Sequence, residues 1–599
     1  MLGASSSAAG KASTSTMDPW AAAKWYIVTK ALGSVPGMKV MLLDNATSAT
    51  VGLVCSQSQA LEFQVYHADK LENPRTKKLD GFRAVVIVRP SSENIRAIRQ
   101  ELSDPKFDEY HLFFTNTLQD HHLQDIARSD LSQVVRQVQE LYVDYFPLGQ
   151  DLFTIDEPSC MALEPPSWDQ PLFDRLCDGI TAVLLALKLN PVIVYQINSP
   201  AANKIAHQVT ERIATGNHSS DPDLFRFGAA AAAKQQPPLL LLLDRRDDPV
   251  TPLLSQWSYS AMVHEMLGLR HNRVTVKKGQ EEEHLVLNPV EDDFYQSAQH
   301  LVFGELGSAL KTIVDEFQKS ESGTVASGGG KSRLSSIADI QRFMENYPDF
   351  KKQQGMVAKH VALTSELSAV VDARNLLDLS ELEQELACEE SLTDSFDRVE
   401  TFLADPKVLQ DDKLRLVALY SLRYQMEGER ETRFLERSLQ DSGLDKEKIK
   451  AIALLRKISG VAVRGSDIFN KRTVMGAAKG IVRRQMEGVK GVSNVLTRYE
   501  PLLASRLAAL KMGGIGALRE SEFKVLGGSA SNRASARPQQ IVVFIVGGAT
   551  YAEARCIAEF NRDNATRGMR AVLGCNVMHT TASYLEDILR SSPQELETS

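Results

Sequence analysis

Apolar and polar positions alternate in the first quarter of the chain in the way expected of strands and helices. Three apolar runs have the length of strands: 38–44, 84–90 and 110–116. Three further stretches carry apolar residues at helical spacing: 91–103, 120–128 and 131–140. Alternating strands and helices predict a parallel sheet covered by helices. We therefore expect a first α/β domain over residues 17–150.

A second alternation leads to an unusual apolar run. It starts with a predicted strand at 151–156, continues through a predicted helix at 171–189 and ends in "LLLLLD", residues 239–244. Five successive leucines leave the strand no polar face, which is typical of a strand buried on both sides of a parallel sheet. Ligands gather beyond the carboxyl ends of such strands. The charges that follow Leu243 could therefore form a catalytic site, a metal site or a joint between domains.

The pattern becomes mainly helical after this charge cluster. Apart from a predicted β-hairpin at 273–288, helical spacing dominates from 253 to 510, and a strand, a glycine turn and a helix return at 541–560. This C-terminal piece is too small to bury a parallel sheet alone. We expect a discontinuous α/β domain, residues 151–260 and 505–599, interrupted by a helical domain at 261–504. The predicted fold class is α/β plus all-α, with two parallel-sheet domains.

Composition narrows the class of function. A net charge of −8 argues against a nucleic-acid binder, which usually has an excess of basic residues. Six scattered cysteines without a CxxC pair suit a reducing compartment and offer no zinc site. No apolar run reaches the roughly 18 residues of a spanning helix, so we expect no membrane insertion. Residues 1–16 lack the pattern of a signal peptide and are expected to be a disordered extension of a cytoplasmic protein.

Catalytic motifs do not fit the chain. An apolar strand that ends in Asp244 resembles the nucleophile strand of haloacid-dehalogenase-like phosphatases, but Arg246 stands where these enzymes need a second carboxylate beside magnesium. The turn in "FIVGGATYAEAR", residues 544–555, lacks the glycine and lysine pattern of nucleotide-binding loops. We therefore predict a protein that is not an enzyme, with no catalytic residue, cofactor or metal.

The segment from 239 to 268 resembles the signature of the SM family, Sec/Munc-type proteins that bind syntaxins and govern SNARE-mediated fusion. The matching residues are Leu243, Asp244, Arg245, Asp248, Thr251, Pro252, Leu253, Leu254 and Tyr259. Four other segments resemble family motifs in the family's order: 39–73, 413–424, 497–503 and 544–555. Two segments, 110–116 and 255–268, are most similar to the vacuolar-protein-sorting branch, which serves trans-Golgi and endosomal syntaxins.

The resemblance implies an arch of three domains and no catalysis. It places five residues at the joint between the split domain and the insertion, in a structural role: Asp244, Arg245, Asp248, Thr251 and Tyr259. It also implies three partners: a syntaxin-type SNARE, a vesicle-side SNARE and the assembled SNARE complex. The syntaxin would recruit the protein from the cytoplasm to Golgi or endosomal membranes. A helical scaffold or tether that binds another coiled coil is the alternative.

In the SM family, a pocket on the first domain takes the N-terminal peptide of the syntaxin. The resemblance implies a pocket over residues 116–141, on two predicted helices, with these apolar residues: Leu118, Leu123, Ile126, Ala127, Val134, Val135 and Val138. The alternative is that they face the sheet, since a helix needs one apolar stripe for its core. Asp44 matches the family position that faces the body of the syntaxin, and its alternative role is to cap a helix.

A proline interrupts a helical pattern in the insertion. Residues 334–346 and the segment after Pro348 both have helical spacing. Proline inside a helix removes a hydrogen bond and clashes with the preceding turn, so we predict a bend at Tyr347 and Pro348. The resemblance implies a hairpin at this place that unfurls and templates the vesicle SNARE. A permanent turn between two ordinary helices is the alternative.

Overall fold

The structure is a computed structural model, and it describes most of the chain. The described residues are 17–158, 168–217, 223–227, 236–278, 281–322, 351–388, 392–465, 468–469, 496–526 and 537–591. The predicted extension at 1–16 and the predicted bend at Tyr347 and Pro348 lie outside these ranges.

The first domain is a five-stranded parallel sheet with helices on both faces. Its strands are β1 (Lys39–Leu43), β2 (Val65–Lys70), β3 (Leu79–Val88), β4 (Phe107–Phe114) and β5 (Val135–Glu140), in the order β2-β1-β3-β4-β5. The helical segments are α1 (Pro19–Lys24), η1 (Trp25–Leu32), α2 (Asn45–Val54), α3 (Gln57–Glu62), α4 (Ser92–Ser103) and α5 (Asp120–Ser129). Alternate strand residues point to opposite faces, so Leu42 packs with Ile95 of α4 and Ile126 of α5, whereas Met41 and Leu43 join the core around α2.

The predicted helix at 131–140 is wrong, because this segment contains the edge strand β5. Asp130 ends α5, and its carboxylate oxygens accept hydrogen bonds from the backbone N–H groups of Val134 and Val135, at 2.9 and 3.0 Å. A register shift then aligns Val135 with Tyr110 and Val138 with Leu112, which both belong to the core under α5. An irregularity in a strand can keep residues three apart on one face. The valines of this irregular strand therefore have the same spacing as apolar residues on one face of a helix.

The second domain joins strands from both ends of the chain. Its strands are β6 (Phe146–Pro147), β7 (Leu152–Thr154), β8 (Val192–Gln196), β9 (Leu239–Asp244), β12 (Phe523–Leu526), β13 (Gln540–Val546) and β14 (Arg570–Cys575), in the order β12-β8-β9-β13-β14-β7-β6. The leucine strand β9 is buried throughout and runs parallel to β8 and β13. Its helices are α6 (Gln170–Ala186), α7 (Pro200–Thr215), α20 (Leu502–Gly513), α22 (Tyr551–Asn564) and α23 (Thr581–Arg590).

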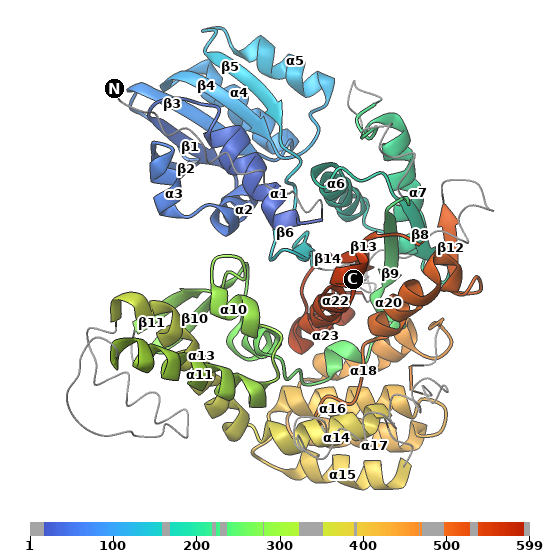
Figure 1. Cartoon of the computed structure of the whole chain (residues 1–599). Coiled ribbons are helices and arrows are strands. Elements are labelled where there is room, and N and C mark those ends of the chain that lie inside the picture. The colour runs from blue at the N-terminus through green and yellow to red at the C-terminus, as the bar shows by residue number, and fades with distance from the viewer. Residues whose placement is uncertain are drawn as a thin grey trace, which may run out of the picture.

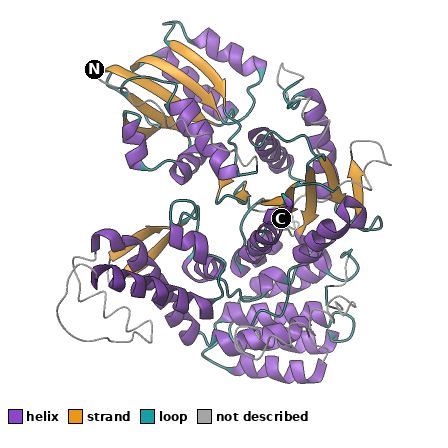
Figure 2. Cartoon of the chain, in the orientation of Figure 1, coloured by secondary structure: helices purple, strands orange, loops and turns teal. Residues whose placement is uncertain are grey.

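The insertion between β9 and β13 is mainly helical, as predicted. It begins with α9 (Tyr259–Met262), η5 (Val263–Leu267) and the predicted hairpin, β10 (Arg273–Lys278) and β11 (Glu281–Val286). Its longer helices are α11 (Phe303–Ser322), α13 (Lys351–Ala373), α14 (Leu376–Cys388), α15 (Leu392–Ala404), α16 (Gln410–Arg423), α17 (Glu429–Asp441) and α18 (Lys446–Ser459), after a short α10 (Asp293–Ala298). Figure 2 shows how little strand this region contains.

The three parts curve into an arch, with the split domain in the middle (Figure 1). The blue N-terminal domain forms one arm, and the green and yellow insertion forms the other. This arrangement confirms the predicted fold class, including the discontinuous second domain, because β9 and β13 pair side by side across the insertion.

Candidate functional site

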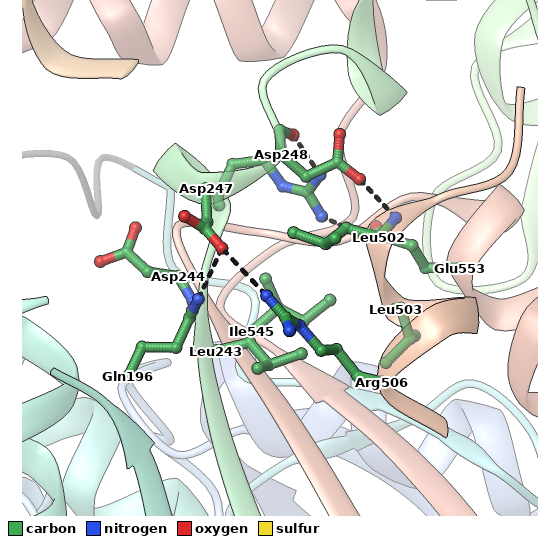
Figure 3. Close-up of a pocket in the computed structure, with 11 residues that line it drawn as sticks. Gln196, Leu243, Asp244, Asp247, Asp248, Leu502, Leu503, Arg506, Ile545 and Glu553 are labelled. Carbon is green, nitrogen blue, oxygen red and sulfur yellow. Dashed lines mark hydrogen bonds and ion pairs between the residues drawn. The ribbon is translucent and has the colours of Figure 1, made fainter. Parts of the chain in front are cut away.

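The charge cluster after β9 lies at the carboxyl edge of the seven-stranded sheet, and Figure 3 shows Asp244, Asp247 and Asp248 among the side chains around them. Asp244 ends the strand, and one of its oxygens accepts hydrogen bonds from the hydroxyl of Ser199 and from Arg246 Nη2, both at 2.5 Å. The other accepts from the backbone N–H and Nε of Arg246, at 2.9 and 3.0 Å. Burial alone would raise the pKa of Asp244, but the guanidinium of Arg246 holds this pKa below its usual value. Asp244 is therefore an engaged carboxylate and not an open nucleophile.

Arg245 joins the two halves of the split domain. Its Nη2 forms an ion pair with Glu553 of α22, and its Nε donates to the carbonyl of Gly548 in the turn after β13, at 3.1 Å. Its Nη1 donates to the carbonyl of Asp248 at 2.8 Å. The Arg245 and Glu553 side chains are 1% and 2% exposed, so each charge depends on the other for compensation.

Asp248 binds the chain where it returns from the insertion. One carboxylate oxygen accepts from the hydroxyl of Tyr499 at 3.0 Å, and the other accepts from the backbone N–H of Leu502, the first residue of α20, at 2.9 Å. The same two oxygens accept from the backbone N–H and hydroxyl of Thr251, at 3.1 and 2.7 Å. The four hydrogen bonds that this one buried carboxylate accepts therefore hold the end of the insertion next to its start.

Asp247 completes the network at the same edge. It accepts from the side chain of Gln196 at 2.8 Å and from the backbone N–H of Gly465, and it lies 3.9 Å from Arg506 of α20. The cavity that these side chains leave measures about 20 Å³, which is room for a single water molecule. The joint is therefore filled by its own side chains.

Tyr259 links the start of the insertion to α13, which lies about a hundred residues further along. Its hydroxyl lies 2.7 Å from Nδ1 of His360, and Nε2 of the same ring lies 3.0 Å from a carboxylate oxygen of Asp292. Burial lowers the pKa of His360, which favours the neutral ring. A carboxylate can only accept, so Nε2 carries the proton and Nδ1 accepts from Tyr259. Despite its burial, Asp292 has a pKa lowered to about 2 by His360 and by Lys359.

A buried histidine makes the stability of this region depend on pH. Burial lowers the pKa of His264 in η5 to about 4, from an ordinary 6.5. Below the ordinary value the unfolded chain binds a proton that the folded chain does not, so stability is lost as pH falls from about 6.5 toward 4. The expected loss at pH 5 is about 2 kcal/mol from this residue. In thermal denaturation, the melting temperature of His264→Phe should fall less between pH 7 and pH 5 than the melting temperature of the wild type.

The exposed His67 of β2 offers a matched control for this experiment. The variant His67→Phe should keep the full pH dependence of the wild type. If the melting temperature of His264→Phe fell between pH 7 and 5 as much as that of the wild type, His264 would not be a cause of the loss of stability at low pH.

The predicted peptide pocket falls on α5 and the edge strand β5. Leu123 and Val138 are 43% and 39% exposed, and Ala127 is also exposed. Leu118, Val134 and Val135 are partly buried against the core below α5, whereas Ile126 is a core residue at 2% exposure. We call the residues of this set that lie outside the core the α5–β5 surface, and it comprises Leu118, Leu123, Ala127, Val134, Val135 and Val138. The alternative, packing toward the sheet, describes Ile126 but not Leu123, and Val138 lies in the edge strand itself with its side chain exposed.

Asp44 has the contacts of a helix cap. One carboxylate oxygen accepts from the backbone N–H of Thr47 at 2.7 Å, at the start of α2. The other accepts from the backbone N–H of Arg89 and the side chain of Asn94, at 2.8 and 2.7 Å. These contacts fix the end of β1 to the loop after β3. They support the structural alternative for this residue.

Reasoning from the sequence missed the partners of the charged joint. It named Asp244, Arg245 and Asp248, but not Glu553 and Tyr499, which lie hundreds of residues away in the chain. The Thr-x-x-Glu pattern that begins at Thr550 could have located the start of α22, where Glu553 forms a capping box. No sequence signal pairs that glutamate with Arg245.

Two classes of feature are absent from the described ranges. No helix there is both long and apolar enough to cross a bilayer. No group of three or more His, Cys, Asp or Glu side chains in the same ranges is arranged to hold a metal ion.

The arch, with one α/β domain split by a helical insertion, defines the SM class of protein. The Sec1 family model matches residues 39–587, so the chain belongs to the Sec1 family. It is 37% identical to human Vacuolar protein sorting-associated protein 45 over 574 residues, covering 95% of this chain and 96% of that protein. The homolog from Arabidopsis thaliana is 38% identical and covers 94% of this chain and 96% of its own length. These relatives confirm the predicted branch.

Solved structures agree with this assignment. The SM protein Vps45 in complex with the Qa SNARE Tlg2 (1–310) matches with a TM-score of 0.81 at 34% identity, over 96% of this chain and 98% of that chain. The Unc18–syntaxin 1 complex from Monosiga brevicollis shares the fold, with a TM-score of 0.77 at 19% identity, over 96% of this chain and 100% of that chain.

Proposed function

We propose that this protein binds a syntaxin-type SNARE and promotes SNARE complex assembly in Golgi, endosomal or vacuolar traffic. The observation that carries the proposal is the match, over 96% of the chain, to an SM protein in complex with a Qa SNARE. The carboxylates and guanidiniums of the charged joint are engaged in holding the domains together, which supports a structural role for these residues. No enzymatic step is proposed.

The α5–β5 surface is the proposed site for the N-terminal peptide of the syntaxin. Leu123 and Val138 supply accessible apolar area, and Ile126 packs α5 onto the sheet below. The proposed site for the body of the syntaxin is the inner side of the arch, near the end of β1 where Asp44 lies. Recruitment from the cytoplasm to Golgi or endosomal membranes would follow from binding the syntaxin.

The vesicle-side SNARE and the assembled SNARE complex are the other proposed partners. We assign them to the helical insertion, where α11 and α13 contact each other on either side of the segment with Tyr347 and Pro348. The proposed role of that segment as a templating hairpin rests on the family resemblance.

A binding screen against the cell's purified syntaxin cytosolic domains tests the proposal. One syntaxin of the trans-Golgi or endosomal type should bind in calorimetry, and deletion of its N-terminal peptide should weaken the binding. The same preparation should show no magnesium-dependent phosphatase activity.

Failure of every syntaxin to bind would contradict the proposed function. Binding that does not depend on the N-terminal peptide would remove the α5–β5 surface from it. A scaffold or tether of the alternative class would bind other coiled coils and leave all the syntaxins unbound.

A further inference from the structure

The helices α15 and α17 form an outer layer of the insertion. They lie at the opposite end of the arch from the α5–β5 surface (Figure 1). On α17, the buried residues Thr432, Leu435 and Leu439 face the bundle. The opposite face of this helix exposes four other residues: Arg430, Arg433, Phe434 and Arg437. The face that a surface helix turns to water is normally polar, so the phenylalanine is the exception here.

Phe434 is an incompletely covered aromatic side chain. It is 47% exposed, and its ring contacts the partly buried Phe396 of α15 with 5.8 Å between centroids. Phe396 in turn reaches Tyr420 of α16, so the pair is anchored to the core of the bundle. A firmly held aromatic ring with an open side has the properties of an anchor in protein interfaces.

The arginines around Phe434 differ in their partners. Arg433 forms an ion pair with Glu429 at 3.1 Å. Arg430 and Arg437, one turn before and one turn after Phe434, form no ion pair within the ranges that the structure describes. Residues four before and three after lie on the same helix face. Two available guanidiniums therefore flank the exposed ring, on a chain whose net charge is −8.

The neighbouring face of α15 has the opposite charge. Asp397 and Glu400 are exposed there, and neither has an ion-pair partner among the described residues. Together the two helices present a basic edge, an aromatic centre and an acidic edge. We call this the α15–α17 surface, and it comprises Phe396, Asp397, Glu400, Arg430, Phe434 and Arg437.

We propose that the α15–α17 surface binds an amphipathic helix of another protein. The partner would place an apolar stripe on Phe434, acidic residues along Arg430 and Arg437, and basic residues along Asp397 and Glu400. Charge complementarity of this kind fixes orientation as well as attraction. An anionic membrane is disfavoured, because the carboxylates of α15 would be pressed against lipid headgroups of the same sign.

Photo-cross-linking of the full-length chain tests this proposal. A benzophenone amino acid in place of Phe434 is activated in cytosol, and the cross-linked peptide is sequenced by mass spectrometry. The expected product is an amphipathic segment with acidic residues on one edge. A synthetic peptide of that sequence should bind the full-length wild-type protein, and Arg430→Glu with Arg437→Glu should weaken it about tenfold or more.

A charge exchange and a matched control make the result specific. Replacing the acidic edge of the peptide by lysine should restore binding to the double variant. The control variant, Arg562→Glu with Arg567→Glu, changes two exposed arginines, one in the last turn of α22 and one just after this helix, and should bind like the wild type. The proposal is overturned by the absence of a cross-link, by cross-links only to lipid or to a second copy of this chain, or by equal binding to the double variant.

Discussion

Replacing Arg245 by alanine should lower the free energy of unfolding by about 3 to 5 kcal/mol, because it leaves Glu553 charged and unpaired in a buried site. The variant also loses the hydrogen bond to the carbonyl of Gly548, which ties the end of β9 to the turn after β13, and the local hydrogen bond to the carbonyl of Asp248. Differential scanning calorimetry should show the transition of the split domain at a clearly lower temperature.

Two further variants separate the buried pair from arginine loss in general. Arg562→Ala removes an exposed arginine, 76% accessible and 3.8 Å from Asp563, and should leave the melting temperature nearly unchanged. Arg245→Met combined with Glu553→Leu removes both charges and should be less harmful than Arg245→Ala alone. A melting temperature for Arg245→Ala equal to that of the wild type would show that the joint does not depend on this pair.

Replacing Leu123 by arginine should abolish or strongly weaken binding of the syntaxin N-terminal peptide while the protein stays folded. Loss of a buried leucine contact costs about 1.5 to 3 kcal/mol, and a charge placed against an apolar anchor adds to this cost. The expected change in affinity is about tenfold to more than a hundredfold. Calorimetric titration of the peptide into wild type and variant measures it.

The control for this variant is Leu61→Arg on α3. Leu61 is 67% exposed, so the same substitution at this site tests whether a new surface charge by itself weakens the peptide. Ile126→Arg is not a suitable variant, because this side chain is in the core and the substitution would unfold α5. Unchanged peptide affinity in Leu123→Arg would remove this residue from the binding site.

The predictions from sequence succeeded where one physical requirement dominated. The five leucines of β9 have no polar face, so only a central buried strand could satisfy them. The C-terminal strands could not bury a sheet by themselves, and they pair with β9 as that argument required. In both cases the burial of apolar area determined the answer, and this requirement can be read from the pattern.

The predictions failed where tertiary contacts determined the outcome. Val135 and Val138 have the spacing of a helix. The carboxylate of Asp130, however, accepts hydrogen bonds from backbone N–H groups that a helix would need, and the segment pairs with β4 instead. The charges after β9 were located from sequence, whereas their partners were not. Arg245 and Glu553 meet only because β9 and β13 are neighbours in the sheet.

The pairing of β9 with β13 also has a consequence for synthesis of the protein on the ribosome. Leu239 lies opposite Ile541, so about 300 residues must be translated before the leucine strand gains this neighbour, which takes roughly 15 to 60 s at 5 to 20 residues per second. During that interval β9 is an apolar sheet edge, the kind of edge that promotes aggregation. The nascent chain therefore has a long period of dependence on chaperones, and a premature stop before β13 would make that dependence permanent.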